Sequence, residues 1–121
     1  MKLIQIYECL CDETRLRIIH LLSKTSLCVT HLQEILKLAQ VKVSKHLAYM
    51  KERGMVEANR RENRMIYSLS AGTCSELDRN LKCLQECIHD HPIFQEDLDE
   101  LQRRWSEVLM FHGKPHERSL E

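Results

Sequence analysis

The chain has 121 residues, 43% of them hydrophobic and 30% charged, and its 18 Lys and Arg residues balance its 18 Asp and Glu residues. This length fits one domain, which is large enough to bury a core without a disulfide or metal. Three Gly and two Pro are too few for the turns of a many-stranded β protein, and the zero total charge, taken alone, argues against a nucleic-acid partner.

The six cysteines make up about 5% of the chain, below the roughly 8–10% that marks a secreted disulfide scaffold. Glu8 interrupts the apolar segment at the start of the chain, and this segment is therefore too short to be the core of a secretory signal. No apolar run approaches the roughly 18 residues of a membrane span. We expect a cytoplasmic protein with no membrane partner, whose reduced thiols are available for metal or redox chemistry.

Apolar residues spaced three or four positions apart predict amphipathic helices from the start of the chain. The first three stripes are Leu3, Ile6, Tyr7 and Leu10; Leu16, Ile19 and Leu22; and Leu32, Ile35 and Leu36. Asp12 is the expected N-cap of the second helix, and Thr30 with Gln33 has the capping-box spacing that opens the third. Residues 26–29 are expected to form a link or a short strand.

A fourth helix follows closely, with Val43, Leu47 and Met50 as its apolar stripe and Gly54 as its left-handed C-terminal cap. Two short helices joined by a turn of a few residues are the outline of a helix-turn-helix. Residues 55–59 and 65–69 are predicted to be extended, with a polar turn over residues 60–64. The pattern therefore predicts a helix-turn-helix followed by a β-hairpin.

Two further helices are predicted in the C-terminal part of the chain. The fifth runs from about Thr73 to Ile88, with Leu77, Leu81 and Leu84 on its stripe, and Pro92 ends it. The sixth carries a heptad seam of Phe94, Leu98, Leu101, Trp105, Val108 and His112. Because a lone helix cannot bury such a seam, we expect it to pack on the fifth helix, on a partner subunit, or on both.

The charged residues are unevenly distributed. Residues 1–36 hold four basic and four acidic side chains, residues 37–64 hold eight and three, and residues 65–121 hold six and eleven. The resulting net charges of 0, +5 and −5 place a basic block on the helix-turn-helix and the hairpin, as expected for a protein that binds duplex DNA. A solvated basic face is the alternative explanation of a charge run taken alone.

The second helix of a helix-turn-helix presents its N-terminal residues to base edges in the major groove. The candidate contacts on this helix are Gln40, Lys42, Ser44 and Lys45. Gln can pair with adenine, and Lys can reach guanine or phosphate. The hairpin arginines Arg60, Arg61 and Arg64 suit phosphate or minor-groove contacts, which position the protein on the duplex.

Three segments together resemble the ArsR/SmtB family of bacterial winged-helix repressors: LCDETRLRIIHLL at 10–22, LCVTHLQEILKLAQVKVSKHLAYMKERGMVE at 27–57 and RMIYSLS at 64–70. The resemblance implies a mainly α, dimeric winged helix-turn-helix with about six helices and a two-stranded β-hairpin wing. It also implies a homodimer joined through the first and last helices and bound to a dyad-symmetric DNA operator. A metal, metalloid or redox signal would release the DNA.

Under this resemblance, residues 1–91 form the winged helix-turn-helix DNA-binding domain with dimerisation helices. Residues 92–121 form the C-terminal helix and tail of the same domain, as a dimer contact. The sequence departs from the family at two places. Ala39 stands where the family usually has a Ser at the start of the recognition helix. Cys28 matches the first cysteine of the motif found in arsenic sensors, but Thr30 and Gln33 stand where the further thiols of that motif would be.

The fifth helix carries the candidate inducer site. Cys83 and Cys87 lie one turn apart and off its apolar stripe, so core packing explains them poorly. Zinc-sensing members of the family bind metal across the dimer on this helix. Cys74 lies about 13.5 Å from Cys83 along one straight helix, so only an antiparallel partner could bring the two together. We therefore expect a metal site of Cys74 from one chain with Cys83 and Cys87 of the other, suited to arsenite or a soft or transition metal ion.

Cys9 and Cys11 stand where the family usually has small residues, which favours packing for both, whereas the role of Cys28 stays open. A thiol-redox or persulfide-sensing repressor of the same fold is the first alternative function. A Cys-rich metal storage or trafficking protein without DNA binding is the second. The sequence holds no Gly-rich phosphate loop, nucleophile elbow or metalloprotease motif, so we expect no enzyme and no obligatory cofactor.

Overall fold

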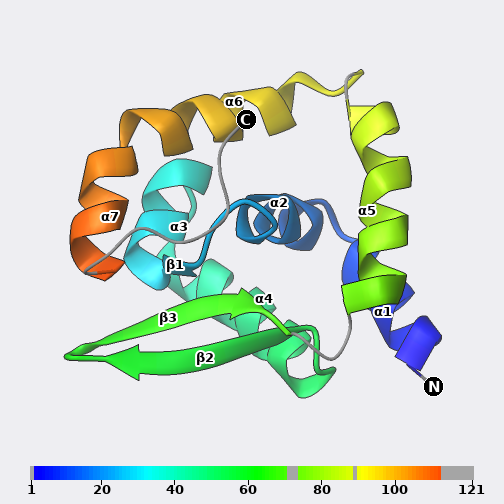
Figure 1. Ribbon diagram of the computed structural model, residues 1–121, viewed down its shortest axis with the longest axis horizontal. Coiled ribbons are helices and arrows are strands. Elements are labelled where there is room, and N and C mark those ends of the chain that lie inside the picture. Colours follow the sequence, from blue (N-terminus) through cyan, green and yellow to red (C-terminus); the bar gives the residue numbers. More distant parts are fainter. Residues whose placement is uncertain (1, 71–73, 89, 113–121) are drawn as a thin grey trace.

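A computed structural model of the chain describes residues 2–70, 74–88 and 90–112, with the side chains of residues 2, 74–76, 85, 111 and 112 left aside. These ranges form seven helices and a three-stranded antiparallel sheet (Figure 1). The elements are α1 Lys2–Leu10, α2 Glu13–Leu22, β1 Leu27–Cys28, α3 Val29–Leu36, α4 Gln40–Glu52, β2 Val56–Arg61, β3 Arg64–Leu69, α5 Cys74–Ile88, α6 Pro92–Arg103 and α7 Trp105–His112. The mainly α fold with a β-hairpin is therefore confirmed.

Of the two predicted helix N-caps, one is confirmed and the other is wrong. Asp12 is the N-cap of α2, and its side chain accepts a hydrogen bond from the backbone N–H of Arg15. The predicted capping box at Thr30 is not used, because α3 starts earlier, with Cys28 as its N-cap. Residues Leu27 and Cys28 pair with β3 as a short strand, so the chain passes from strand to helix without a linker.

The helix-turn-helix consists of α3 and α4, joined by a short turn in which Lys37 adopts a left-handed conformation. Val43, Leu47 and Met50 are fully buried, as their spacing predicted. Gly54 follows the end of α4 at a φ of 75°, where its missing side chain avoids strain. The predicted left-handed cap is therefore confirmed, and it directs the chain into β2.

The β2–β3 hairpin, called the wing below, is longer than the sequence pattern indicated. Arg60 and Arg61 belong to β2 and Arg64 begins β3, so the connecting turn has only Glu62 and Asn63. Arg61 pairs with Arg64 at the tip, and β3 lies between β1 and β2. The three arginines therefore stand on paired strands, whose backbones fix their positions better than the expected loop would.

The predicted sixth helix divides at Arg104 into α6 and α7, which accounts for the seventh helix. Its seam residues Phe94, Leu101 and Val108 are buried. The main neighbours of α6 are α2 and α3 of the same chain rather than the expected fifth helix. Packing of the seam on a partner subunit, the other expectation, stays a prediction. Figure 1 shows α6 lying across the top of α2 and α3.

A buried ion pair attaches α6 to α2. The guanidinium of Arg17 donates hydrogen bonds of 2.9 and 2.8 Å to the two carboxylate oxygens of Asp97, and both side chains are at least 90% buried. Arg17 also donates to the carbonyl oxygen of Leu36 at the end of α3. The Arg17 side chain thus connects α2 to α6 and to the end of α3, the first helix of the helix-turn-helix.

The hydrophobic core continues from α1 through α2, α3 and α4 to the wing base and α5. Among the helices that the structure describes, none combines the length and the apolar character that crossing a bilayer requires.

Candidate nucleic-acid interface and thiol site

The predicted base-reading residues lie in the first two turns of α4. Gln40, Lys42 and Lys45 are exposed and Ser44 is half-buried, whereas Val43 and Leu47 are buried in the core. The buried stripe fixes the rotation of the helix, so the first two turns present their polar residues outward. This is the arrangement by which a recognition helix offers its N-terminal half to a groove.

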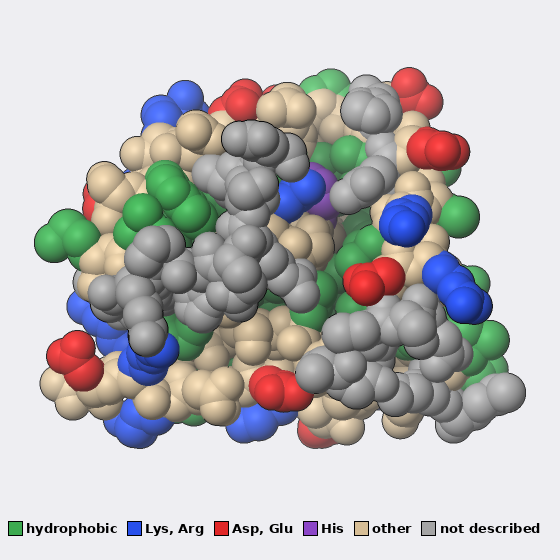
Figure 2. Space-filling model, in the orientation of Figure 1, with side chains coloured by type: hydrophobic (Ala, Val, Ile, Leu, Met, Phe, Trp, Pro, Cys, Tyr) green, Lys and Arg blue, Asp and Glu red, His purple; other side chains and the backbone are tan. Residues whose placement is uncertain are grey.

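The wing adds a second basic surface beside α4. Arg60, Arg61 and Arg64 are all exposed, and Figure 2 shows basic side chains around the wing at the lower left. Seven of the eight basic residues between 37 and 64 are exposed, and Arg53 is the exception. Apart from Lys37 in the turn before α4, these exposed residues stand on α4 and the wing. We call Lys42, Lys45 and the three wing arginines the basic face.

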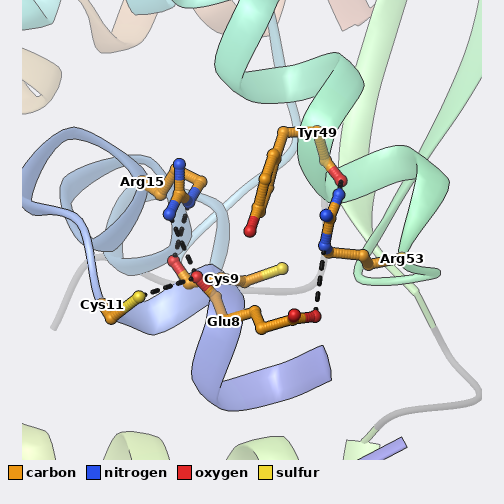
Figure 3. Close-up of polar contacts among 6 residues, drawn as sticks. All are labelled: Glu8, Cys9, Cys11, Arg15, Tyr49 and Arg53. Carbon is orange, nitrogen blue, oxygen red and sulfur yellow. Dashed lines mark hydrogen bonds and ion pairs between the residues drawn. The ribbon is translucent and has the colours of Figure 1, made fainter. Parts of the chain in front are cut away.

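Arg53 instead belongs to a cluster that joins α1 and α2 to α4 (Figure 3). Its guanidinium lies 3.4 Å from the ring centroid of Tyr49, and that of Arg15 lies 4.0 Å from the same centroid. Arg53 bonds the carboxylate of Glu8 at 3.3 Å, and Arg15 donates to the carbonyl oxygens of Glu8 and Cys9. Tyr49 therefore lies between two cations that are both bound to the end of α1, a cation–π arrangement.

Sequence reasoning missed this Arg15–Tyr49–Arg53 cluster. Tyr49 and Arg53 are four residues apart at one end of α4, a spacing that places their side chains next to each other. Their contact could therefore have been predicted from the sequence. Arg15 and Glu8 come from other elements and carry no local signal. His46 lies at its edge, with Nδ1 3.4 Å from Arg15, and burial lowers the pKa of His46 below its usual value.

The N-terminus of α4 lacks a side-chain cap, because Ala39 is its N-cap residue. Replacement of Ala39 by Ser is expected to raise the free energy of unfolding by about 1 kcal/mol, since a hydroxyl can accept a hydrogen bond from an otherwise unpaired backbone N–H. Urea denaturation measures the effect. The control is Ala48→Ser, at an exposed position in the middle of α4. An equal gain in the free energy of unfolding there would contradict the capping explanation.

The thiols fall into buried and exposed groups among the described side chains. Cys83 and Cys87 are exposed on α5, and Cys11 is exposed beyond the end of α1. The expected packing role of Cys11 is therefore wrong, because its position follows the last turn of α1 and faces outward. The predicted packing of Cys9 is confirmed: it is fully buried, and burial raises the pKa of its thiol to about 11.

Cys28 is also buried, with its Sγ 3.4 Å from Nδ1 of His31. Cys74 is the first residue of α5, but its side chain lies outside the described part of the structure. Among the side chains described, no group of three or more His, Cys, Asp or Glu is placed to hold a metal ion. Among the described side chains of α5, the exposed thiols are therefore Cys83 and Cys87, which we call the thiol pair.

The helix-turn-helix, the wing and the basic face define a winged helix-turn-helix protein. The same fold occurs in the homodimeric DNA-binding domain Mb0332 of Mycobacterium bovis, with a TM-score of 0.62 and 22% identity over 74% of this chain and 81% of that one. The family model for bacterial regulatory proteins of the arsR family matches residues 12–58.

Two curated relatives extend the match. The arsenical resistance operon repressor of Escherichia coli K12 is 38% identical over 90 residues, which cover 70% of this chain and 77% of that protein. The arsenic resistance transcriptional regulator ArsR1 of Pseudomonas putida KT2440 is 35% identical over 78 residues, 64% of this chain but only 61% of that protein. The chain belongs to the arsR family of bacterial regulatory proteins.

Proposed function

We propose that the protein is a transcriptional repressor that binds a dyad-symmetric operator as a homodimer. In this proposal α4 enters the major groove, and the wing contacts phosphates or the adjacent minor groove. The observation that carries it is the basic face itself, with Gln40, Lys42 and Lys45 exposed in the first two turns of a helix whose apolar stripe is buried. Two such helices, one from each subunit, would lie about one turn of DNA apart.

The dimer has support from the N-terminal helix. Ile4 and Tyr7 on α1 are 56% and 54% exposed, and Leu3 is 38% exposed. Exposed apolar residues on one helix favour contact with another protein surface. The Mycobacterium bovis domain with the same fold is a homodimer. We infer that α1 and the last helices of the chain join the two subunits.

Lys45→Glu tests the recognition helix. The variant is expected to weaken binding to a duplex selected from a random pool by at least about tenfold, because one base-edge contact contributes about 1–3 kcal/mol. Fluorescence anisotropy at two salt concentrations gives the affinity and its salt slope. Lys82→Glu, an equal charge change at an exposed position of α5, is the control.

Equal losses in the two Lys variants would show that charge alone, rather than α4, controls binding. Failure of the wild type to bind duplex DNA at low salt would remove the proposal and favour the metal storage or trafficking function. A selected operator without dyad symmetry would contradict binding as a dimer of equivalent subunits.

The inducer is proposed to be arsenite or a soft or transition metal ion that binds Cys83 and Cys87 of one chain with Cys74 of its partner. Support comes from the exposure of the thiol pair, from the preference of thiolates for soft ions, and from the arsenic-resistance roles that the names of the two relatives state. Binding would favour a dimer geometry with the wrong spacing of the recognition helices. A redox signal at the same thiols is the competing possibility.

Titration of the operator complex with arsenite, zinc, cadmium, copper(I) or polysulfide identifies the signal. The reduced wild-type dimer is expected to release DNA with one of the first four, and Cys83→Ser is expected to remain bound. Release by polysulfide alone would favour the persulfide-sensing alternative. Release of both proteins by the same ion would remove the thiol pair from the mechanism.

A further inference from the structure

Val41 is an apolar residue on the outer surface of the recognition helix. It lies in the first turn of α4, and its side chain is 79% exposed. The apolar stripe of the same helix, formed by Val43, Leu47 and Met50, is fully buried. Val41 therefore contributes little to the core of its own chain.

The direction of Val41 follows from the rotation of α4. With about 100° per residue along a helix, Val41 and Lys45 both lie within about 30° of the direction opposite the middle of the buried stripe. The two residues are four positions apart, so their side chains are neighbours on the surface. Lys42 and Lys45 are both exposed beside Val41. The part of α4 that extends farthest from the core is thus apolar in its first turn and basic in the next.

The stability of the helix gives no reason for a valine at this position. A β-branched side chain loses rotamer freedom in a helix, and valine ranks below alanine, lysine and glutamine in helix propensity. An exposed Val41 therefore stabilises neither the helix nor the core. Contact with another molecule is the role that its position supports.

The charges around Val41 indicate which molecule this is. A second copy of the chain, related by a two-fold axis through this surface, would bring Lys42 and Lys45 close to their own counterparts, and like charges oppose such contact. Duplex DNA is complementary instead, because its phosphates line the grooves with negative charge. In the major groove, thymine presents a C5-methyl group that aliphatic side chains contact. We propose that Val41 contacts the methyl group of one thymine in each half of the operator and so determines part of its sequence.

A methyl contact recognises a feature that the polar residues of α4 do not read. Cytosine, the other pyrimidine, carries a hydrogen at C5 and a donor in place of the O4 acceptor of thymine. Uracil keeps the O4 acceptor and the pairing with adenine, and it lacks only the methyl group. Replacement of thymine by uracil therefore removes the partner of Val41 and leaves the hydrogen-bonding groups of the base pair in place.

Uracil scanning of the operator tests the contact, which rests on the proposed repressor function. The probe is the duplex that the wild-type protein selects from a random pool. Each thymine is replaced by uracil in turn, at the equivalent positions of both half-sites. Fluorescence anisotropy is expected to show one position at which the double replacement weakens binding about tenfold, because each lost methyl contact accounts for about fourfold.

Variants of α4 assign this effect to its residue. Val41→Ser is expected to bind the thymine duplex about tenfold more weakly than the wild type and to bind the thymine and uracil duplexes equally well. Serine matches valine in helix propensity, and the salt slope should stay that of the wild type because no ionic contact is lost. Val41→Ile should keep the discrimination. Ala48→Ser, the same kind of change at an exposed position two turns along α4, should keep it as well.

An equal effect of uracil in the wild type and in Val41→Ser would assign the preference to the shape of the DNA and overturn the proposal. So would a bound operator in which no thymine is sensitive to uracil, or a loss of discrimination in Ala48→Ser instead of Val41→Ser. Failure of the wild type to bind any duplex from the pool would remove the repressor function itself, and the methyl contact with it.

Discussion

Asp97→Ala is expected to lower the free energy of unfolding by about 3–5 kcal/mol, the usual cost of removing one partner of a buried ion pair. The loss arises mainly from Arg17, whose guanidinium would remain buried without the carboxylate that now receives two of its hydrogen bonds. Folded domains are stable by only about 5–15 kcal/mol. One substitution on α6 should therefore remove a large part of the total.

Urea denaturation followed by circular dichroism measures this change. Asp99→Ala is the matched control, because Asp99 is exposed on the same helix, and it should change the stability by less than about 0.5 kcal/mol. The double variant Arg17→Met/Asp97→Leu should recover most of the loss, since apolar residues of similar size can replace a buried pair. An equal loss in the double variant would show that packing, rather than the unpaired charge, dominates.

The second large effect is a fall in stability with acid that depends on His20. This ring is 4% exposed and packs edge-on against Phe94 of α6, with 5.6 Å between the ring centroids. Burial, together with the nearby charge of Lys24, lowers the pKa of His20 to about 4. The folded state therefore binds the proton less readily than the unfolded state, whose histidine has a pKa of about 6.5.

The contribution of the neutral His20 ring to the free energy of unfolding is fully present above pH 6.5. It is lost as the pH falls from 6.5 towards about 4. The loss amounts to about 3 kcal/mol, because each pKa unit corresponds to about 1.4 kcal/mol. His20→Phe should remove this part of the pH dependence, and His91→Gln, at an exposed position, should not. The measurement is the free energy of unfolding at pH 7, 5.5 and 4. Parallel curves for His20→Phe and the wild type would contradict the assignment.

The sequence predicted the elements whose residues follow a regular spacing. Val43, Leu47 and Met50 are three and four residues apart and face the core, and Gly54 ends the helix at a conformation that favours glycine. The division of the last helix at Arg104 left no such signal, because the heptad spacing continues through it. The partner of α6 was also hidden, since Arg17 and Asp97 read separately as ordinary surface charges.

The candidate site divides in the same way. The exposure of Lys42, Lys45 and the wing arginines follows from local periodicity and from hairpin pairing, so the basic face could be expected. The Arg15–Tyr49–Arg53 cluster depends on how α1 and α2 lie relative to α4. No local pattern encodes that relation. For Cys11, the small residues that the family usually has at this position favoured a packing role, whereas the side chain is exposed.

The Arg17–Asp97 pair also bears on the order in which the chain can fold. Its two residues are 80 positions apart, so the pair closes a loop that spans most of the protein. Such distant contacts form late because the chain entropy of loop closure opposes them. During synthesis, α2 and the helix-turn-helix would leave the ribosome well before α6 does, with the Arg17 charge still without its carboxylate. The packing around α2 and α3 is therefore complete only once α6 has been made, and we expect chains that stop short of Asp97 to be less stable than the full chain.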